Sequence, residues 1–299
     1  MKSSIQILVV SASLAIGCGS SRQSAWDTTP QNTQVTAAQR QQATTAAQTA
    51  DAAWAERGTE ARLRAAIAAW EQVVAANPTD HETLTKLSRA YYFLADGYLS
   101  FDEANQPEMM STYEKGTQAA EHALMGLSSD FAQRMQAGTR IEEAVSILDR
   151  TAVPALYWRS ANLGKWAAAQ GFATLLSYKD EIRAVMTRCL ELDANYFYAG
   201  PHRYFGAFYA RAPSFAGGDL VRSKEHFEQS VRAAPNYFAT RVLYAQDYAV
   251  KAQERATFDA QLAYVLAHQP NELPDAEPEN AVEQHKARDL QARVADLFE

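Results

Sequence analysis

The chain has 299 residues, of which 47% are apolar and 21% are charged, and its net charge is −7 at pH 7. This length and apolar content allow a large buried core. The acidic balance lacks the basic surface that nucleic-acid binding requires, which excludes that class of partner. Cysteine occurs only at positions 18 and 189, so the fold must be stabilised by packing and not by a disulfide framework.

The first 17 residues predict an export signal. Lys2 is followed by an apolar run over residues 5–16 and then by Gly17 and Cys18. A basic start and an apolar stretch of about 7 to 15 residues are typical of a signal peptide. The small residue before Cys18 resembles the lipobox of bacterial lipoproteins, which predicts that Cys18 becomes the first mature residue and is lipidated. The alternative is an ordinary signal peptide in which Cys18 is incidental.

Lipidation would anchor the mature chain to a membrane without spanning it, because each buried CH₂ contributes roughly 0.8 kcal/mol. Gly19 follows Cys18 and resembles an outer-membrane sorting residue, so we expect a lipid-anchored protein of the cell envelope that faces the periplasm. Residues 18–44 are rich in Ser, Thr, Gln, Asn and Ala and predict a flexible tether. The portion from Ala37 onward is also compatible with an extension of the first helix.

Residues 45–299 predict one all-α domain, because nearly every segment has a helical period. The 34-residue tetratricopeptide pattern recurs along it, which predicts an α-solenoid of tetratricopeptide-like helical repeats with inserted loops and a C-terminal capping helix. The positions expected in the core of this frame are Trp70, Tyr91, Phe205, Phe227 and Leu262. A weaker repeat places Cys189 on a small-residue packing position, which predicts a buried and unreactive thiol.

Two insertions interrupt the frame. Residues 213–219 add five positions at a turn between paired helices, where Gly217 and Gly218 permit positive φ and Asp219 is suited to cap the next helix. A phosphate-binding loop is the alternative, but no Lys follows in the required spacing and no strand precedes. Residues 101–110 lengthen the second helix pair by about 16 positions over the standard repeat, and such loops are where repeat proteins often bind partners.

Several strings within residues 46–298 go beyond the general repeat pattern: "DAAWAERG", "AIAAWEQVVAANPTD", "PALYWRSANLGKWA", "GPHRYFGAFYARAPSFAGGDLVRSKEHFEQS", "VLYAQDYAV" and "PENAVEQHKARDLQ". Together they resemble the TatT family, the T components associated with tripartite ATP-independent periplasmic (TRAP) transporters. The specific part of the match lies in the strings over residues 158–166 and 200–219. The resemblance implies a helical-repeat lipoprotein that self-associates, with a trimer as one possibility, and engages the periplasmic solute-binding P component. It supplies no catalytic motif.

The sequence offers little catalytic chemistry. None of the six histidines, His81, His122, His202, His226, His268 and His285, is spaced three or four residues from another, so no helical metal site is predicted. There is no Gly-x-Ser-x-Gly elbow, and Cys189 has no neighbouring His in the sequence. We therefore expect no metal, no cofactor and no enzymatic activity.

A candidate groove follows from the repeat frame, because the first helix of each pair lines the concave surface. The stripe expected there consists of Arg89, Tyr92, Trp158, Lys165, Arg203, Arg211 and Gln246. Four cations and two aromatic rings on an acidic chain suit an organic anion with an apolar body, or an acidic peptide. The alternative is that these are ordinary solvated residues, with Trp158 and Tyr92 in the core. The function expected is a membrane-anchored TRAP accessory; the alternative is a general envelope scaffold.

Overall fold

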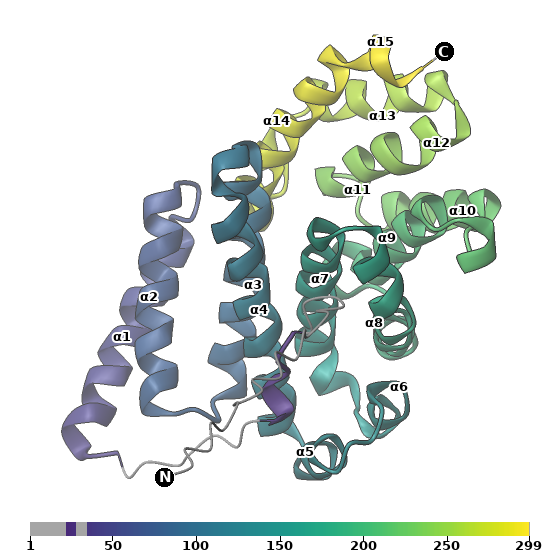
Figure 1. Cartoon of the computed structure of the whole chain (residues 1–299). Helices are drawn as coiled ribbons and strands as arrows, with labels where there is room; N and C mark the ends of the chain where they lie inside the picture. The colour runs from purple at the N-terminus through teal and green to yellow at the C-terminus, as the bar shows by residue number, and fades with distance from the viewer. Residues whose placement is uncertain (1–21, 28–34, 299) are drawn as a thin grey trace, which may run out of the picture.

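A computed structural model describes residues 22–27 and 35–298, and within these ranges every regular element is a helix (Figure 1). The all-α prediction is thereby confirmed. The predicted signal peptide over residues 1–17 and the predicted lipidation site at Cys18 lie outside the described residues.

Two helix pairs form the N-terminal part of the body. They are α1 (Ala37–Ala55) with α2 (Glu60–Ala76), and α3 (His81–Gly97) with α4 (Gln106–Leu127). The side chains of Thr36, Thr59 and Asp80 accept hydrogen bonds from backbone N–H groups in the first turns of α1, α2 and α3, which satisfies donors that a helix start leaves unpaired. α1 thus begins inside the range expected to be tether.

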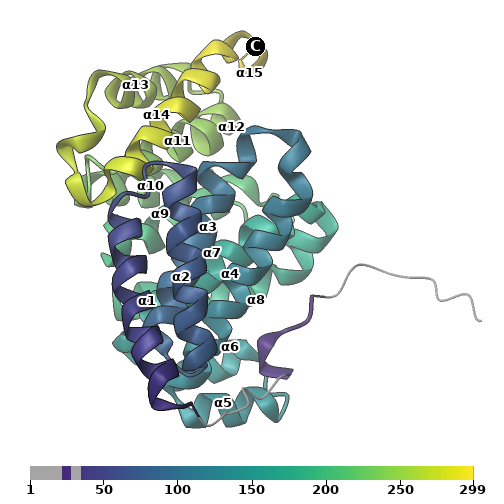
Figure 2. The same cartoon turned by 90° about the vertical axis from the view of Figure 1, so that its left-hand side faces the viewer.

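The middle of the chain adds further packed pairs. After α5 (Ser129–Gln136) and α6 (Ile141–Ala144), α7 (Val153–Gln170) packs on α8 (Phe172–Leu192), and α9 (Tyr196–Arg211) packs on α10 (Leu220–Ala233). α7 also contacts α3 and α4, so it lies at the centre of the molecule. Figure 1 shows α3 and α4 between the α1–α2 pair and α7, and Figure 2, viewed from the side of α1 and α2, shows those two helices in front.

The C-terminal part returns toward the first helices. α11 (Phe238–Leu243) continues through a π-helical turn, η7 (Tyr244–Ala249), into α12 (Val250–Ala252), and α13 (Arg255–Ala267) and α14 (Glu277–Ala292) follow before α15 (Val294–Leu297). Figure 1 shows α14, in yellow, reaching the upper end of α3. Glu279 of α14 forms ion pairs with Arg57 (2.8 Å) and Arg89 (2.9 Å). These ion pairs hold α14 against the N-terminal helices, so α14 connects the two ends of the body.

Short 3₁₀ turns connect these helices. They are η1 (Ala25–Asp27), η2 (Leu99–Phe101), η3 (Glu103–Asn105), η4 (Val145–Ile147), η5 (Arg150–Ala152), η6 (Ser214–Ala216), η8 (Pro270–Glu272) and η9 (Pro274–Ala276). The insertion over residues 101–110 is therefore itself helical, since it consists of the end of η2, η3 and the first turn of α4.

The predicted core positions are confirmed. Trp70, Tyr91, Phe205, Phe227 and Leu262 are all buried. Cys189 is fully buried as well, and burial raises the pKa of its thiol far above the ordinary value, so the thiolate is disfavoured as expected.

The turn over residues 213–219 differs from its prediction at one residue. Gly217 has φ +95° and lies in the left-handed region, as expected. Gly218 does not have positive φ; a Cβ added there would lie 1.8 Å from the carbonyl oxygen of Ala212, so close backbone approach is the reason for glycine. Asp219 caps α10, because its Oδ1 accepts from the backbone N–H of Arg222 at 3.1 Å.

A candidate ligand cavity between the two ends of the body

A cavity of about 460 Å³ opens between α3, α7, α9, α11 with η7, and α14. All seven residues of the predicted stripe line it: Arg89, Tyr92, Trp158, Lys165, Arg203, Arg211 and Gln246. The predicted stripe therefore lies along one cavity. The frame did not include the wall that α14 supplies with Glu279, Glu283 and Lys286.

Three of the four predicted cations already have a carboxylate partner. Arg89 pairs with Glu279, Lys165 pairs with Asp96, and Arg211 pairs with Asp247 at 2.9 Å. The sequence interpretation did not include these carboxylate partners. Because the acids lie on α3, η7 and α14, far from their partners in the sequence, periodicity gave no signal for the pairing.

Asp96 joins two ammonium groups at the cavity wall. Lys286 Nζ lies 2.7 Å from Asp96 Oδ2, and Lys165 pairs with the other carboxylate oxygen. Burial by itself would raise the pKa of Asp96, but the two positive charges outweigh burial and hold the pKa well below its usual range. Asp96 therefore remains an anion, and it ties α14 to α3 and α7.

Arg203 is the exception among the predicted cations. Its side chain is buried, and among the described residues it makes no ion pair with a carboxylate. Its guanidinium donates to Tyr157 Oη at 2.8 Å and to the carbonyl oxygens of Tyr198 (3.1 Å) and Phe197 (3.2 Å), and it lies over the ring of Tyr237 at 4.6 Å. A buried cation without an opposing charge favours an anion beside it.

A left-handed turn positions these carbonyl groups. Phe197, Tyr198 and Ala199 have φ values of 45°, 58° and 55°, a conformation that costs non-glycine residues on the order of 1–3 kcal/mol each. The turn directs two carbonyl oxygens to Arg203 and packs the Phe197 ring 4.6 Å from Trp158. Such strain is common at functional sites, and no sequence pattern indicated it.

The two predicted aromatic residues are both packed and cavity-lining. Tyr92 and Trp158 have ring centroids 5.4 Å apart. The Trp158 indole N–H donates to Tyr196 Oη at 3.1 Å, and only 3% of Trp158 is exposed. The core interpretation of Trp158 is therefore correct, while the edge of the ring still forms part of the cavity wall.

A second, apolar cavity of about 220 Å³ adjoins the first, between α7, α8, α9 and the turn over residues 212–216. Its lining includes Leu175, Ile182, Met186 and Phe208. The two cavities share Tyr92, Tyr157, Lys165, Arg203, Arg211 and Leu243. Arg203 therefore lies where a charged space meets an apolar one. Sequence reasoning missed this second space because α8 was not assigned to the concave surface.

The family model of the TRAP transporter T-component matches residues 59–298, which is most of the described body. The chain belongs to this family. Membership implies an accessory role in TRAP transport at the cell envelope. An uncharacterized protein of Treponema pallidum (strain Nichols) is 25% identical to this T component over 244 residues, covering 74% of each chain.

Three observations in the described part of this T component concern membrane spans, metal sites and a histidine pair. No helix there is long and apolar enough to cross a membrane, and no group of three or more His, Cys, Asp or Glu residues could hold a metal ion. The Nδ1 atoms of His202 and His226 do meet at 2.9 Å across α9 and α10, a pair that sequence spacing did not reveal. Burial, aided by the neighbouring His202 and Arg222, lowers the pKa of His226 to about 4.

Proposed function

We propose that this protein is a lipid-anchored periplasmic T component that binds an organic anion with an apolar body and engages the solute-binding P component of a TRAP system. Its helices pack as tetratricopeptide-like repeats, and Cys18 carries the anchor. The protein acts by binding and not by catalysis. The observation that carries the ligand proposal is the position of Arg203, a buried guanidinium that has no carboxylate partner among the described residues and lies where the charged and apolar cavities meet.

The ligand chemistry follows from this geometry. The four Nη–H groups of Arg203 already donate to Tyr157, Phe197, Tyr198 and Thr240. An acidic head group would therefore lie against the uncompensated charge of Arg203 and accept from its Nε–H, and an apolar tail would fill the space lined by Ile182, Met186 and Phe208. Lys165 and Arg211 line both cavities, but each is neutralised by an acid of the protein. Arg203 is therefore the cation that discriminates an anion from a neutral molecule of the same shape.

Calorimetric titration with aliphatic carboxylates of increasing chain length, each compared with the alcohol of equal length, tests this proposal. A charge-assisted hydrogen bond contributes roughly 1.5 to 3 kcal/mol, so the carboxylates should bind at least about tenfold tighter. Arg203→Met should remove that preference. Arg40→Met, which removes an exposed cation on α1, is the matched control. Equal binding of acids and alcohols by the wild type would contradict the proposal.

The proposed docking face for the P component lies next to the apolar cavity, whose lining includes Phe172, Pro213 and Ala216. Phe172, at the start of α8, is 59% exposed, and Phe215 and Val221, around the turn before α10, are 79% and 70% exposed. Exposed apolar side chains of this size commonly mark interaction surfaces. Phe215→Ser combined with Val221→Ser, at two exposed residues that line neither cavity, should weaken capture of the purified P component while leaving carboxylate binding intact. Unchanged capture would favour a different face, and no capture by the wild type would favour a general scaffold.

Self-association is proposed on the resemblance to the family. Sedimentation equilibrium of the mature protein measures it directly, and a monomer at every concentration would contradict it.

A further inference from the structure

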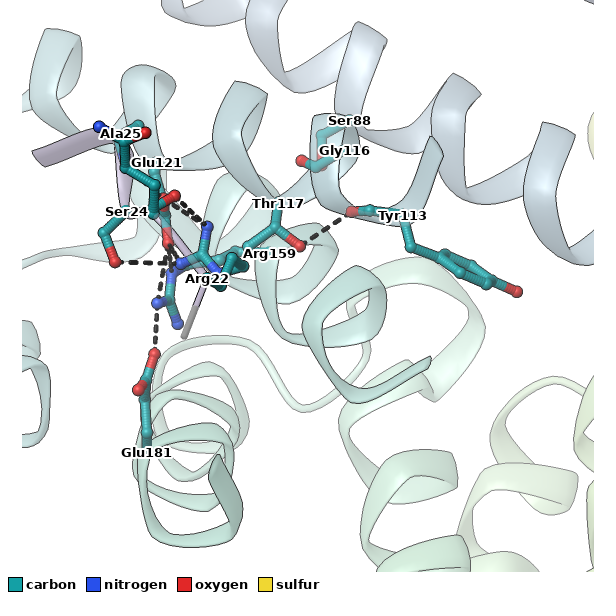
Figure 3. Close-up of polar contacts among 11 residues, drawn as sticks. Arg22, Ser24, Ala25, Ser88, Tyr113, Gly116, Thr117, Glu121, Arg159 and Glu181 are labelled. Carbon is teal, nitrogen blue, oxygen red and sulfur yellow. Dashed lines mark hydrogen bonds and ion pairs between the residues drawn. The ribbon is translucent and has the colours of Figure 1, made fainter. Parts of the chain in front are cut away.

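Residues 22–27, which the sequence assigned to a flexible tether, lie docked on the body. Figure 3 shows Arg22 and Ala25 directed toward Glu121 of α4. η1 contacts α4 and α5, and Trp26 is buried with its ring 6.0 Å from that of Phe131 in an edge-to-face arrangement. The physical reason is that the folded body offers Trp26 an apolar partner in Phe131 and offers Arg22 a buried carboxylate in Glu121.

The polar contacts of this segment converge on one carboxylate. Arg22 bonds both oxygens of Glu121, with Nη1 to Oε2 at 3.1 Å, and the backbone N–H of Ala25 donates to Oε2 at 2.8 Å. The side chains of Arg22 and Glu121 are 1% and 0% exposed. Buried charge-assisted bonds of this kind are much stronger than surface ion pairs.

The buried charges balance only when the segment is docked. Arg159 also bonds Glu121, with Nη2 at 3.0 Å, and pairs with Glu181 (Figure 3). The Arg159 guanidinium lies 4.9 Å from the Trp26 ring. Two guanidinium groups thus face two carboxylates. Without Arg22, a single cation would face both acids, and uncompensated buried charge is strongly unfavourable.

We propose that residues 22–27 form a strap that holds the membrane-attached N-terminus against the face of α4 and α5 and so sets the distance and orientation of the body at the bilayer. This rests on the proposed lipidation of Cys18. Only residues 19–21 separate Cys18 from Arg22, and four extended steps span at most about 14 Å. If the strap is released, the next described contact of the chain with the body is α1, which starts at Ala37, and the 19 steps from Cys18 to Ala37 allow a reach of up to roughly 65 Å.

Hydrogen exchange of the mature protein, residues 18–299, tests whether the strap is docked. The amide of Ala25 should be protected, and Arg22→Glu should raise its exchange rate at least about tenfold, since the variant removes two bonds to Glu121 and reverses a buried charge. Arg40→Glu makes the same charge change on exposed α1 and should have no effect. Fast exchange of the Ala25 amide in the wild type would overturn the proposal. Equal exchange rates of this amide in the wild type and in Arg22→Glu would overturn it as well.

The distance to the membrane is tested by coupling a maleimide lipid to Cys18. The buried thiol of Cys189 does not compete, and chemical coupling makes this test independent of whether cells acylate Cys18. Neutron reflectometry on a supported bilayer should show a gap of at most about 14 Å between the bilayer and the α4–α5 face of the wild-type body, and a wider gap below Arg22→Glu. An unchanged gap would overturn the role of the strap. If Arg22→Glu unfolds the body, Arg22→Gln replaces it, because Glu121 then keeps Arg159.

Discussion

Replacing Phe227 by Ala tests the packing between α9 and α10 on which the fold depends. Phe227 is fully buried and stacks on Tyr244, with ring centroids 5.0 Å apart and planes 13° from parallel. A Cβ added to Gly206 would lie 2.7 Å from the Phe227 ring, so helix α9 approaches this ring as closely as its backbone allows. The neighbouring backbone is therefore already packed against the ring and can shift little to fill the cavity that truncation of Phe227 would leave.

The expected loss of stability follows from this close packing. Truncating a buried Phe to Ala typically costs about 3 to 5 kcal/mol. For a folded part of this size, 1 kcal/mol corresponds to roughly 2–4 °C in Tm, so Phe227→Ala should lower Tm by roughly 6 to 20 °C. Phe215→Ala is the matched control, because the same atoms are removed from a side chain that is 79% exposed.

Thermal unfolding followed by circular dichroism at 222 nm is the assay. Both variants should retain the helical signal at low temperature, and only Phe227→Ala should unfold earlier. Equal Tm values for the two variants would refute the reasoning, because they would mean that the ring contributes no more inside the α9–α10 pair than on the surface.

Two further predictions concern ionisation and reactivity. Asp96 has a folded-state pKa below the ordinary value of 3.8, so its ion pairs stabilise the fold above the unfolded pKa, and that contribution disappears as pH falls toward the folded pKa. Asp96→Asn should therefore have a lower free energy of unfolding than the wild type at pH 7, and the difference between the two proteins should shrink below about pH 4. Denaturant unfolding at pH 7 and pH 3 measures this difference, and the same difference at both pH values would count against a lowered pKa of Asp96. Cys189 should resist maleimide in the native protein and react after unfolding, as mass spectrometry would reveal; labelling of the native protein would contradict its burial.

The helical periodicity of the sequence predicted those features that depend on residues close together in the chain. The helical spacing located Trp70, Phe227 and Leu262 in the core, since one face of a helix must be buried. The cap at Asp219 and the left-handed conformation of Gly217 were predictable too, because both depend on residues within one turn; the close approach of Gly218 to the Ala212 carbonyl was not. The strings along the chain also indicated the family that the comparison confirmed.

Only the tertiary structure decided which charges meet. Asp96, Asp247 and Glu279 neutralise cations on other elements, and the left-handed turn at Phe197 supplies carbonyl oxygens to Arg203. The repeat frame brought the predicted stripe to one cavity, yet it held no information on the return of α14 or the docking of Arg22 on Glu121. Both contacts join residues about a hundred or more positions apart. Their formation depends on the accumulated angles of many helix pairs, which local periodicity does not specify.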